Sequence, residues 1–239
     1  AVRQSGSRAV AGFIGAGNYG GKVLAKAFKQ AGCGLDTIVS STGVAAVHYG
    51  RKFAFAHAAS DAEAVLGSEA INSVVISTRH DSHARYVVAG LEAGKNVFVV
   101  KPRCLTRQEL SDIETVAARP DAPVLMVGFN RRFAPMVVRL KQALARTPEA
   151  KSFVMTVNAG AVAGDHWVQD PVQGGGRIVG EACHFIDLLR HLAGAAIESR
   201  KVTTMRGAVA GALPDTVVIS LGFASAGLVG AVDSAEECA

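Results

Sequence analysis

A glycine-rich sequence near the start of the chain, GAGNYG at residues 15–20, constrains the fold more than any other feature. It follows an apolar run at residues 9–14, which has the pattern of a buried strand. Residues 19–30 then carry apolar side chains at helical spacing, and this pattern stops at Gly32 and Gly34. A strand, a glycine turn and a helix in this order predict the first βα unit of a dinucleotide-binding domain.

The glycines of this turn fit the G-x-G-x-x-G pattern, in which each has a physical role. Gly15 permits the tight turn, Gly17 lets the backbone approach a pyrophosphate, and Gly20 allows the helix to pack closely on the strand. The N-terminal end of the helix favours an anion. The alternative is a turn that only connects two elements. The expected cofactor contacts are Gly15, Ala16, Gly17, Asn18, Tyr19 and Gly20.

Strand-like and helix-like segments continue to alternate up to about residue 130. The expected strands are residues 35–40, 71–77, 96–100 and 124–127. The expected helices are residues 60–66, residues 82–92 and a segment that begins at Thr106, where Glu109 completes a capping box. Continuous apolar strands that alternate with helices are typical of a parallel sheet covered on both faces. We therefore predict a Rossmann-type α/β domain over residues 1–130.

The pattern changes in the second half of the chain. Helices are expected at residues 133–146 and 181–192, and strands at residues 151–158, 199–206 and 216–223, with a strand–turn–strand within residues 216–232. Longer strands with few helices between them predict an α+β domain over residues 131–239.

Composition excludes several classes of partner. Hydrophobic residues make up 49% of the 239 residues and charged residues 19%, which is a globular balance. No apolar run approaches the roughly 18–20 residues of a membrane span, so no membrane partner is expected. The net charge of +5 suits a phosphorylated ligand, but Lys and Arg are not clustered as in nucleic-acid-binding proteins.

The cysteines and the first residue bear on the context of the chain. Cys33, Cys104, Cys183 and Cys238 show no C-x-x-C spacing, which indicates reduced thiols of a cytoplasmic protein. The first residue is not Met, so we expect a processed product or a piece of a longer protein.

The end of the second expected strand bears on the choice of cofactor. NAD-binding sites usually carry Asp or Glu there, where it binds the ribose. This chain has Ser40 and Ser41 instead, and Arg51 and Lys52 follow nearby. Serine can hydrogen-bond either ribose, and no carboxylate is present to repel a 2′-phosphate. We therefore expect NAD or NADP, with a slight preference for NADP.

Two further loops follow expected strands, at the sheet edge where parallel-sheet proteins bind ligands. The second of them is the pair Lys101-Pro102, in which Pro102 can adopt a cis peptide bond. Lys101 and Pro102 would line the cofactor, and Lys101 would orient a substrate hydroxyl or carry its proton; the alternative is a solvated surface lysine. The first loop, TRHDSH, would line the cofactor with Thr78, Arg79, His80 and His83. For His83, the alternative is a structural role in the first turn of a helix.

A glycine run at residues 174–176 precedes the helix expected in the second domain. Glu181, His184 and Asp187 follow at intervals of three and would share one helix face. His184 would act as a general base, with Glu181 orienting it or binding a sugar hydroxyl, and Asp187 would contact the substrate. The alternative is a salt-bridged surface row. Because no further ligand cluster accompanies these residues, no metal site is expected.

These motifs, together with GFNRRFAP at residues 128–135, resemble the Gfo/Idh/MocA oxidoreductase family over nearly the whole chain. The resemblance implies hydride transfer between NAD(P) and a sugar, cyclitol or sugar nucleotide, with Lys101 and His184 in the catalytic positions. It also implies a mostly antiparallel, open sheet in the second domain that forms a homo-oligomer interface and stops early here. Sequences such as STRHDSHARYVV resemble a branch fused behind a zinc-type alcohol dehydrogenase domain and linked to surface-polysaccharide synthesis.

Two positions depart from the family pattern. Val100 stands where the family commonly has Glu, and Gly180 where it often has Asp, with Glu181 one step later. These departures favour one alternative function, a non-catalytic nucleotide-binding or regulatory module. A second alternative is an enzyme that uses transient oxidation to drive an elimination or glycoside cleavage. Trp167 would stack on a sugar or nicotinamide, or serve as a core residue, and Arg131 would meet a substrate phosphate or be solvated.

Overall fold

The computed structural model describes residues 8–147, 149, 151–204, 216–224 and 229–233. The chain divides into two compact units, and the division falls between Gly128 and Phe129. Cys238 and the last two residues of the strand expected at 199–206 lie outside the described residues.

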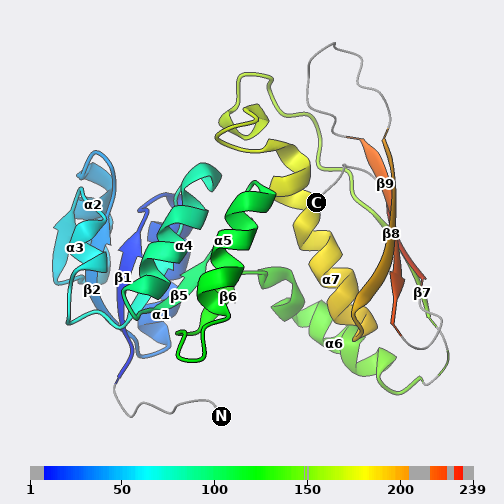
Figure 1. Cartoon of the computed structure of the whole chain (residues 1–239), viewed down its shortest axis with the longest axis horizontal. Coiled ribbons are helices and arrows are strands. Elements are labelled where there is room, and N and C mark those ends of the chain that lie inside the picture. The colour runs from blue at the N-terminus through cyan, green and yellow to red at the C-terminus, as the bar shows by residue number, and fades with distance from the viewer. Residues whose placement is uncertain (1–7, 148, 150, 205–215, 225–228, 234–239) are drawn as a thin grey trace. The chain divides into compact units, whose positions relative to one another are not determined.

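The first unit contains a six-stranded parallel sheet in the order β3-β2-β1-β4-β5-β6 (Figure 1). This is the strand order of a dinucleotide-binding Rossmann fold, in which the order reverses between β1 and β4. Its strands are β1 (Val10–Ile14), β2 (Gly34–Val39), β3 (His57–Ala59), β4 (Ser73–Ile76), β5 (Asn96–Val99) and β6 (Leu125–Val127).

Helices connect the strands of this sheet. The helix after β1 begins as a π-helical segment, η1 (Asn18–Leu24), and continues as α1 (Ala25–Gln30). The capping box predicted at Thr106 is present: its side chain accepts from the Glu109 N–H, and the Glu109 side chain accepts from the Thr106 N–H. The remaining helices are α2 (Val44–Phe53), α3 (Glu63–Leu66), η2 (His80–Ser82), α4 (His83–Glu92) and α5 (Arg107–Ala117).

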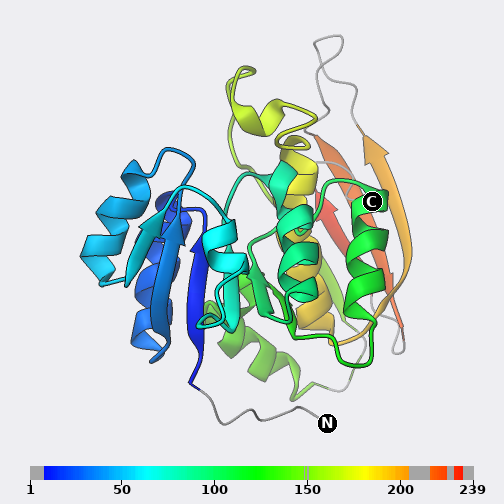
Figure 2. The same ribbon diagram turned by 60° about the vertical axis from the view of Figure 1, so that its left-hand side comes forward.

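The sheet buries a separate apolar cluster on each face, because neighbouring residues of a strand point to opposite sides. On β1, Phe13 packs edge-to-face against Phe28 of α1 and against Phe55, with ring centroids 5.5 and 5.3 Å apart. The next residue, Ile14, joins the opposite cluster with Val87 of α4 and Ile113 of α5. Helices therefore cover both sides of the strands (Figure 2).

The second unit contains a mixed, mostly antiparallel sheet in the order β7-β10-β9-β8. Strand β10 pairs parallel with β7, whereas β9 pairs antiparallel with both β10 and β8. The strands are β7 (Ser152–Thr156), β8 (Ile197–Thr204), β9 (Val217–Phe223) and β10 (Val229–Asp233), and the helices are η3 (Asn130–Phe133), α6 (Pro135–Leu144), η4 (Trp167–Gln169), η5 (Ile178–Ala182) and α7 (Cys183–Ala193).

One face of this sheet is covered by η5 and α7. Leu189 of α7 packs with Ile219 and Leu221 of β9, and all three are almost fully buried. Figure 1 shows α7 running beside the sheet. Together with the parallel sheet of the first unit, this arrangement confirms the predicted fold class.

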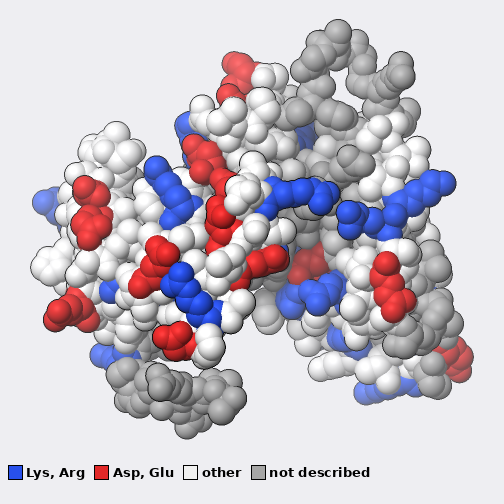
Figure 3. Space-filling view, in the orientation of Figure 1, with Lys and Arg blue, Asp and Glu red and all other residues white. Residues whose placement is uncertain are grey.

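The surface carries both signs of charge. In Figure 3, Lys and Arg side chains are interspersed with Asp and Glu across the visible face of the described residues. Among the described helices, none has both the length and the apolar character that crossing a membrane requires.

Candidate nucleotide and substrate site

The glycine loop joins β1 to η1, and two of its glycines are explained by the fold. Gly15 has φ +105°, and a Cβ there would lie 2.6 Å from the backbone of Ser77 at the end of β4. A Cβ on Gly20 would collide with the Ser77 hydroxyl, which itself donates to the Gly15 carbonyl at 2.9 Å. These two glycines let the loop and the helix approach β4 closely.

Gly17 has no such explanation within the protein. Its backbone is extended, with φ −71° and ψ −177°, and a Cβ on it would meet no atom of the described residues within 4 Å. Gly17 lies at the start of η1, where backbone N–H groups lack helical partners and favour an anion. The open space above Gly17 therefore fits a phosphate that approaches the backbone closely, as in dinucleotide sites. Around it, Asn18 and Tyr19 are exposed, and Ala16 is buried.

The serines at the end of β2 differ in their surroundings. The Ser40 hydroxyl accepts from the Ala46 N–H at 3.1 Å and so holds the loop that leads into α2. Ser41 is exposed. Arg51 and Lys52 are exposed in the last turn of α2. Of the two serines, Ser41 has the more accessible side chain for a ribose.

Hydrogen bonds order the loop after β4. The hydroxyls of Thr78 and Ser82 lie 2.6 Å apart, and Ser82 also donates to the Arg79 carbonyl at 2.9 Å. Arg79 is exposed and His80 is buried, with its ring centroid 5.7 Å from that of His83.

His83 lies inside the fold rather than on the surface of the loop. It is fully buried, with Nδ1 2.6 Å from the Pro102 carbonyl oxygen and Nε2 3.1 Å from that of Thr78. Burial lowers the pKa of His83, although the two carbonyls oppose this shift. We therefore correct the expected cofactor contact: because its ring is enclosed, His83 supports the loops after β4 and β5 instead.

The Lys-Pro pair follows β5 directly. The Lys101–Pro102 peptide bond is cis, as the sequence suggested. Lys101 is half-buried, so its side chain is partly accessible at the end of the strand. Val100, which precedes it, packs against the apolar cluster around Phe13.

In the second unit, Asp187 forms an ion pair with Arg132. Arg132 Nε donates to Asp187 Oδ2 at 2.9 Å, and Nη2 donates to Oδ1. Asp187 is buried, and this contact raises the pKa of Arg132. Both carboxylate oxygens of Asp187 thus bind a guanidinium that joins η3 to α7, and the expected substrate contact of Asp187 stays a prediction.

His184 and Glu181 lie on the same helical segment but in different surroundings. His184 is buried on α7, and its ring meets that of Phe129 edge-to-face, with centroids 6.1 Å apart. Glu181 is half-buried in the π-helical segment η5. Glu181 therefore lies in a π-helical turn, whereas His184 and Asp187 lie in α7, and the expected row of three side chains on one face stays a prediction.

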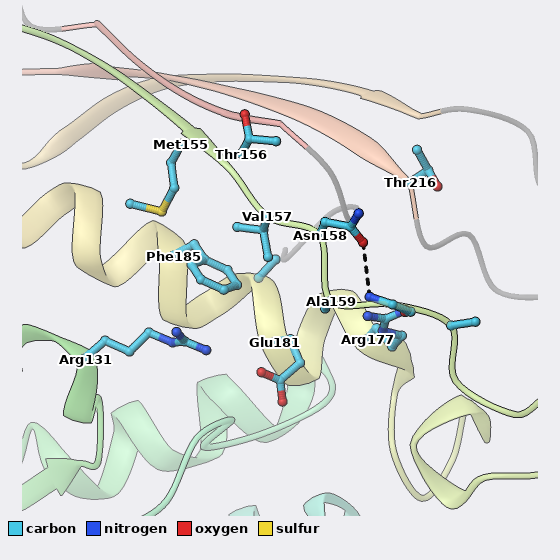
Figure 4. Close-up of a pocket in the computed structure, with 13 residues that line it drawn as sticks. Arg131, Met155, Thr156, Val157, Asn158, Ala159, Arg177, Glu181, Phe185 and Thr216 are labelled. Atoms are coloured by element: carbon cyan, nitrogen blue, oxygen red, sulfur yellow. Dashed lines mark hydrogen bonds between the residues drawn. The ribbon is translucent and has the colours of Figure 1, made fainter.

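A cavity of about 890 Å³ lies between η5, α7 and the segment that follows β7 (Figure 4). Two residues expected at the site, Arg131 and Glu181, line it. Asn158 and Arg177, which no sequence pattern indicated, also line it. Neither residue belongs to a glycine motif or to a helical row of polar side chains. Asn158 follows a strand, and Arg177 lies in the helical turn that leads into η5.

Trp167 belongs to η4, in the loop before the glycine run. It is half-buried, and its ring lies 5.8 Å from that of His166. The turn that follows is held by Asp170, whose carboxylate accepts from the N–H groups of Val172 and Gln173, both at 2.8 Å. The structure thus gives the DHWVQDP loop a defined conformation, and the proposed stacking of Trp167 stays a prediction.

The parallel sheet, its strand order and the space above Gly17 define a dinucleotide-binding protein of the Rossmann class with a second α/β domain. Residues 10–129 match the family model described as an oxidoreductase family, NAD-binding Rossmann fold, and residues 149–238 match its C-terminal α/β domain. The chain belongs to the Gfo/Idh/MocA oxidoreductase family.

Curated relatives and solved structures are similar to the chain at low identity. Oxidoreductase P35 of Formosa agariphila is 26% identical over 200 residues, which cover 80% of this chain and 62% of that protein. Inositol 2-dehydrogenase 2 of Saccharopolyspora erythraea is 27% identical over 184 residues, which cover 72% and 52%. A structure of levoglucosan dehydrogenase with NADH has a TM-score of 0.82 at 24% identity, covering 96% and 67%, and shows the shared fold.

The chain spans only part of the length of these relatives. The matched regions cover 62% and 52% of the two curated proteins.

Proposed function

We propose that this protein is an NAD(P)-dependent oxidoreductase that acts on a carbinol carbon of a sugar, cyclitol or sugar nucleotide. Membership of an NAD-binding oxidoreductase family supports this proposal, as do relatives named inositol 2-dehydrogenase and levoglucosan dehydrogenase. The observation that carries it is the open space above Gly17, at a helix N-terminus of a Rossmann sheet. We further propose that the protein acts in surface-polysaccharide synthesis, as part of a fusion to a zinc-type alcohol dehydrogenase domain.

The cofactor would be held at the ends of β1, β2, β4 and β5. The backbone of residues 15–20 would bind the pyrophosphate, Ser41 the ribose, and Thr78 and Arg79 the remaining edge of the site. Without a carboxylate at the end of β2, we propose that NADP is accepted at least as well as NAD. When bound there, the cofactor would supply hydride transfer to or from the carbinol carbon.

Lys101 is the residue that we propose for the proton. Oxidation of a carbinol releases the hydroxyl proton as the hydride leaves, so a group within hydrogen-bond reach of the hydroxyl must take it. As a neutral amine, Lys101 Nζ would orient the hydroxyl and accept this proton, and the ammonium so formed would return it in the reverse direction. His184, which the family resemblance also puts in a catalytic position, would act as a general base, and Glu181 would orient it or bind a sugar hydroxyl.

We also propose that the protein forms a homo-oligomer through the sheet of the second unit. One face of this sheet exposes apolar side chains, with Val154 79% exposed and Val218 39% exposed. Burial of such a face against a second copy is favourable. Light scattering after gel filtration tests this, and a monomer at micromolar concentration would contradict it.

An assay of NAD(P)⁺ reduction, with wild-type protein and a Lys101→Met variant, tests the catalytic proposal. NADH and NADPH formation is followed by absorbance with a panel of hexoses, inositols and sugar nucleotides. We expect turnover with at least one member, and a loss of about 10²- to 10⁴-fold in kcat in the variant, with cofactor affinity retained. Lys26→Met, at an exposed position of α1, is the matched control.

Each outcome separates the proposal from its rivals. Cofactor binding without turnover of any substrate would favour the non-catalytic module. Product formation without a net change in NAD(P)H would favour transient oxidation followed by elimination or glycoside cleavage. Equal turnover by Lys101→Met would refute the assignment of the proton to Lys101.

A further inference from the structure

The described side chains that line the cavity of the second unit carry more positive than negative charge. Of the described residues that line it, two carry a guanidinium, Arg131 and Arg177, and one carries a carboxylate, Glu181. In Figure 4, the two arginines extend toward the cavity from opposite sides, and Glu181 lies between them in this view. The described part of the wall therefore carries one positive charge in excess, in a space bounded by the ring of Phe185 and the side chain of Asn158.

Arg131 is held so that its guanidinium faces this space. Its Cζ lies 4.4 Å from the centroid of the Phe185 ring, which is a cation–π contact. The neighbouring residue in η3, Arg132, is fixed to α7 through its ion pair with Asp187. Contacts on both residues thus hold Arg131 against α7, although its side chain remains exposed. A preorganised guanidinium loses less conformational entropy when it binds a ligand.

Arg177 is placed differently and plays a supporting part. It is only 7% exposed, and Nη1 donates to the Gly160 carbonyl oxygen at 2.7 Å. This bond joins the start of η5 to the segment that follows β7, which carries Asn158. Arg177 therefore sets one wall of the cavity and adds its positive charge to it.

We propose that the cavity binds a sugar derivative that carries a carboxylate or phosphate group, with Arg131 as its anion partner. The inference rests on the proposed function, because it names the substrate class for the same enzyme. The planar guanidinium matches either anion in a paired geometry, and such charge-assisted bonds are about twice as strong as neutral ones. Glu181 and Asn158 would bind sugar hydroxyls.

The size of the cavity agrees with such a ligand. At about 890 Å³ it lies toward the upper end of the roughly 300–1,000 Å³ range of small-molecule sites. It has room for an acidic sugar and for part of a linked phosphate. A uronic acid and a nucleoside diphosphate sugar both carry the negative charge that Arg131 would bind. Binding measurements show which of these two ligand classes the cavity prefers.

The test measures binding directly and so does not depend on turnover. Calorimetric titrations compare matched pairs of probes: D-glucuronate with D-glucose, D-galacturonate with D-galactose, and UDP-glucose with uridine and D-glucose. We expect an acidic member of at least one pair to bind at least tenfold more tightly than its neutral partner. Preference for glucuronate or galacturonate indicates a uronate, and preference for UDP-glucose alone indicates the diphosphate.

Variants tie this preference to the cavity. Arg131→Met should lower the affinity for the acidic probe about 10- to 100-fold and leave that for the neutral partner unchanged. Arg131→Lys should retain part of the preference, because it keeps the charge but loses the paired geometry. Arg139→Met, which removes a charge from an exposed position of α6, is the matched control and should bind like wild type.

The inference is overturned if no acidic probe binds better than its neutral partner, or if Arg131→Met keeps the full preference while its melting temperature matches that of wild type. The proposed function fails separately: an acidic probe that binds through Arg131 but is never oxidised or reduced with either cofactor would refute the oxidoreductase and leave the anion site standing.

Discussion

His83 Nδ1 lies 2.6 Å from the carbonyl oxygen of Pro102, although the two residues are 19 positions apart in the chain. The other ring nitrogen lies 3.1 Å from the Thr78 carbonyl oxygen. One buried imidazole thus joins the loop after β4 to the turn after β5 that carries Lys101. The position of the proposed proton carrier therefore depends on a side chain that is itself enclosed.

Replacement of His83 should destabilise the first unit. His83→Leu leaves two buried carbonyl oxygens without the imidazole, which should lower the free energy of unfolding by about 1–3 kcal/mol. It should also lower kcat by displacing Lys101. Urea unfolding and the reduction assay measure the two effects. His48→Leu, at an exposed position of α2, is the control, and equal stability of both variants would contradict the role of His83.

The buried His83 also predicts how stability depends on pH. Because burial lowers the pKa of His83 in the folded protein, the unfolded chain binds the proton first as the pH falls below about 6.5. The contribution of neutral His83 to the free energy of unfolding is complete above that pH. Below it, this contribution decreases by at most about 1.4 kcal/mol per pH unit, until the pKa of His83 in the folded protein is reached. Unfolding at pH 7.5, 6.0 and 5.0 should show a steeper loss for wild type than for His83→Leu; parallel curves would contradict this.

The loop glycines should separate folding from binding. Gly20→Ala places a methyl group against the Ser77 hydroxyl, and Gly15→Ala puts a side chain at φ +105°, so both should destabilise the fold, by about 1–3 kcal/mol. Thermal unfolding measures this. Melting temperatures equal to that of wild type would show that the loop does not pack as tightly on β4 as the structure indicates.

The ion pair in the second unit should act on stability rather than on substrate binding. Arg132→Met leaves the buried Asp187 carboxylate without its guanidinium, and we expect a loss of about 2–3 kcal/mol, because charged hydrogen bonds are lost. Asp187→Asn should lose less, because the amide oxygen can still accept. If Asp187→Asn instead raised KM for the substrate without changing stability, Asp187 would contact the substrate.

The sequence predicted most of the first sheet, because its strands are continuous apolar runs. It missed α2 and β3. Strand β3 has only three residues, and His57 and Ala58 are exposed, so no apolar run marks it. Helix α2 contains Gly50, which weakens its helical pattern, although this glycine lies close to Ile38 and Ala58. Tertiary packing therefore stabilises both elements, and single-sequence patterns do not report it.

The candidate site was predictable where local chemistry defines it. The glycine loop and the cis-proline turn could be located from spacing alone, and Arg131 and Glu181, which the sequence also singled out, line the cavity of the second unit. Roles that depend on distant partners could not be found. Asp187 pairs with Arg132 across 55 positions, and Arg177 binds Gly160 across 17, and no sequence pattern indicates either contact.

Calorimetric titration of wild type and Gly17→Ala with NAD and NADP tests the central claim most directly. Among the residues that the structure describes, none has an atom within 4 Å of a methyl group on Gly17, so the variant should unfold like wild type. If the open space receives the pyrophosphate, wild type should bind one dinucleotide per chain, and the variant should bind it at least tenfold more weakly. Failure of wild type to bind either cofactor, or equal affinity of a folded Gly17→Ala variant, would contradict the account.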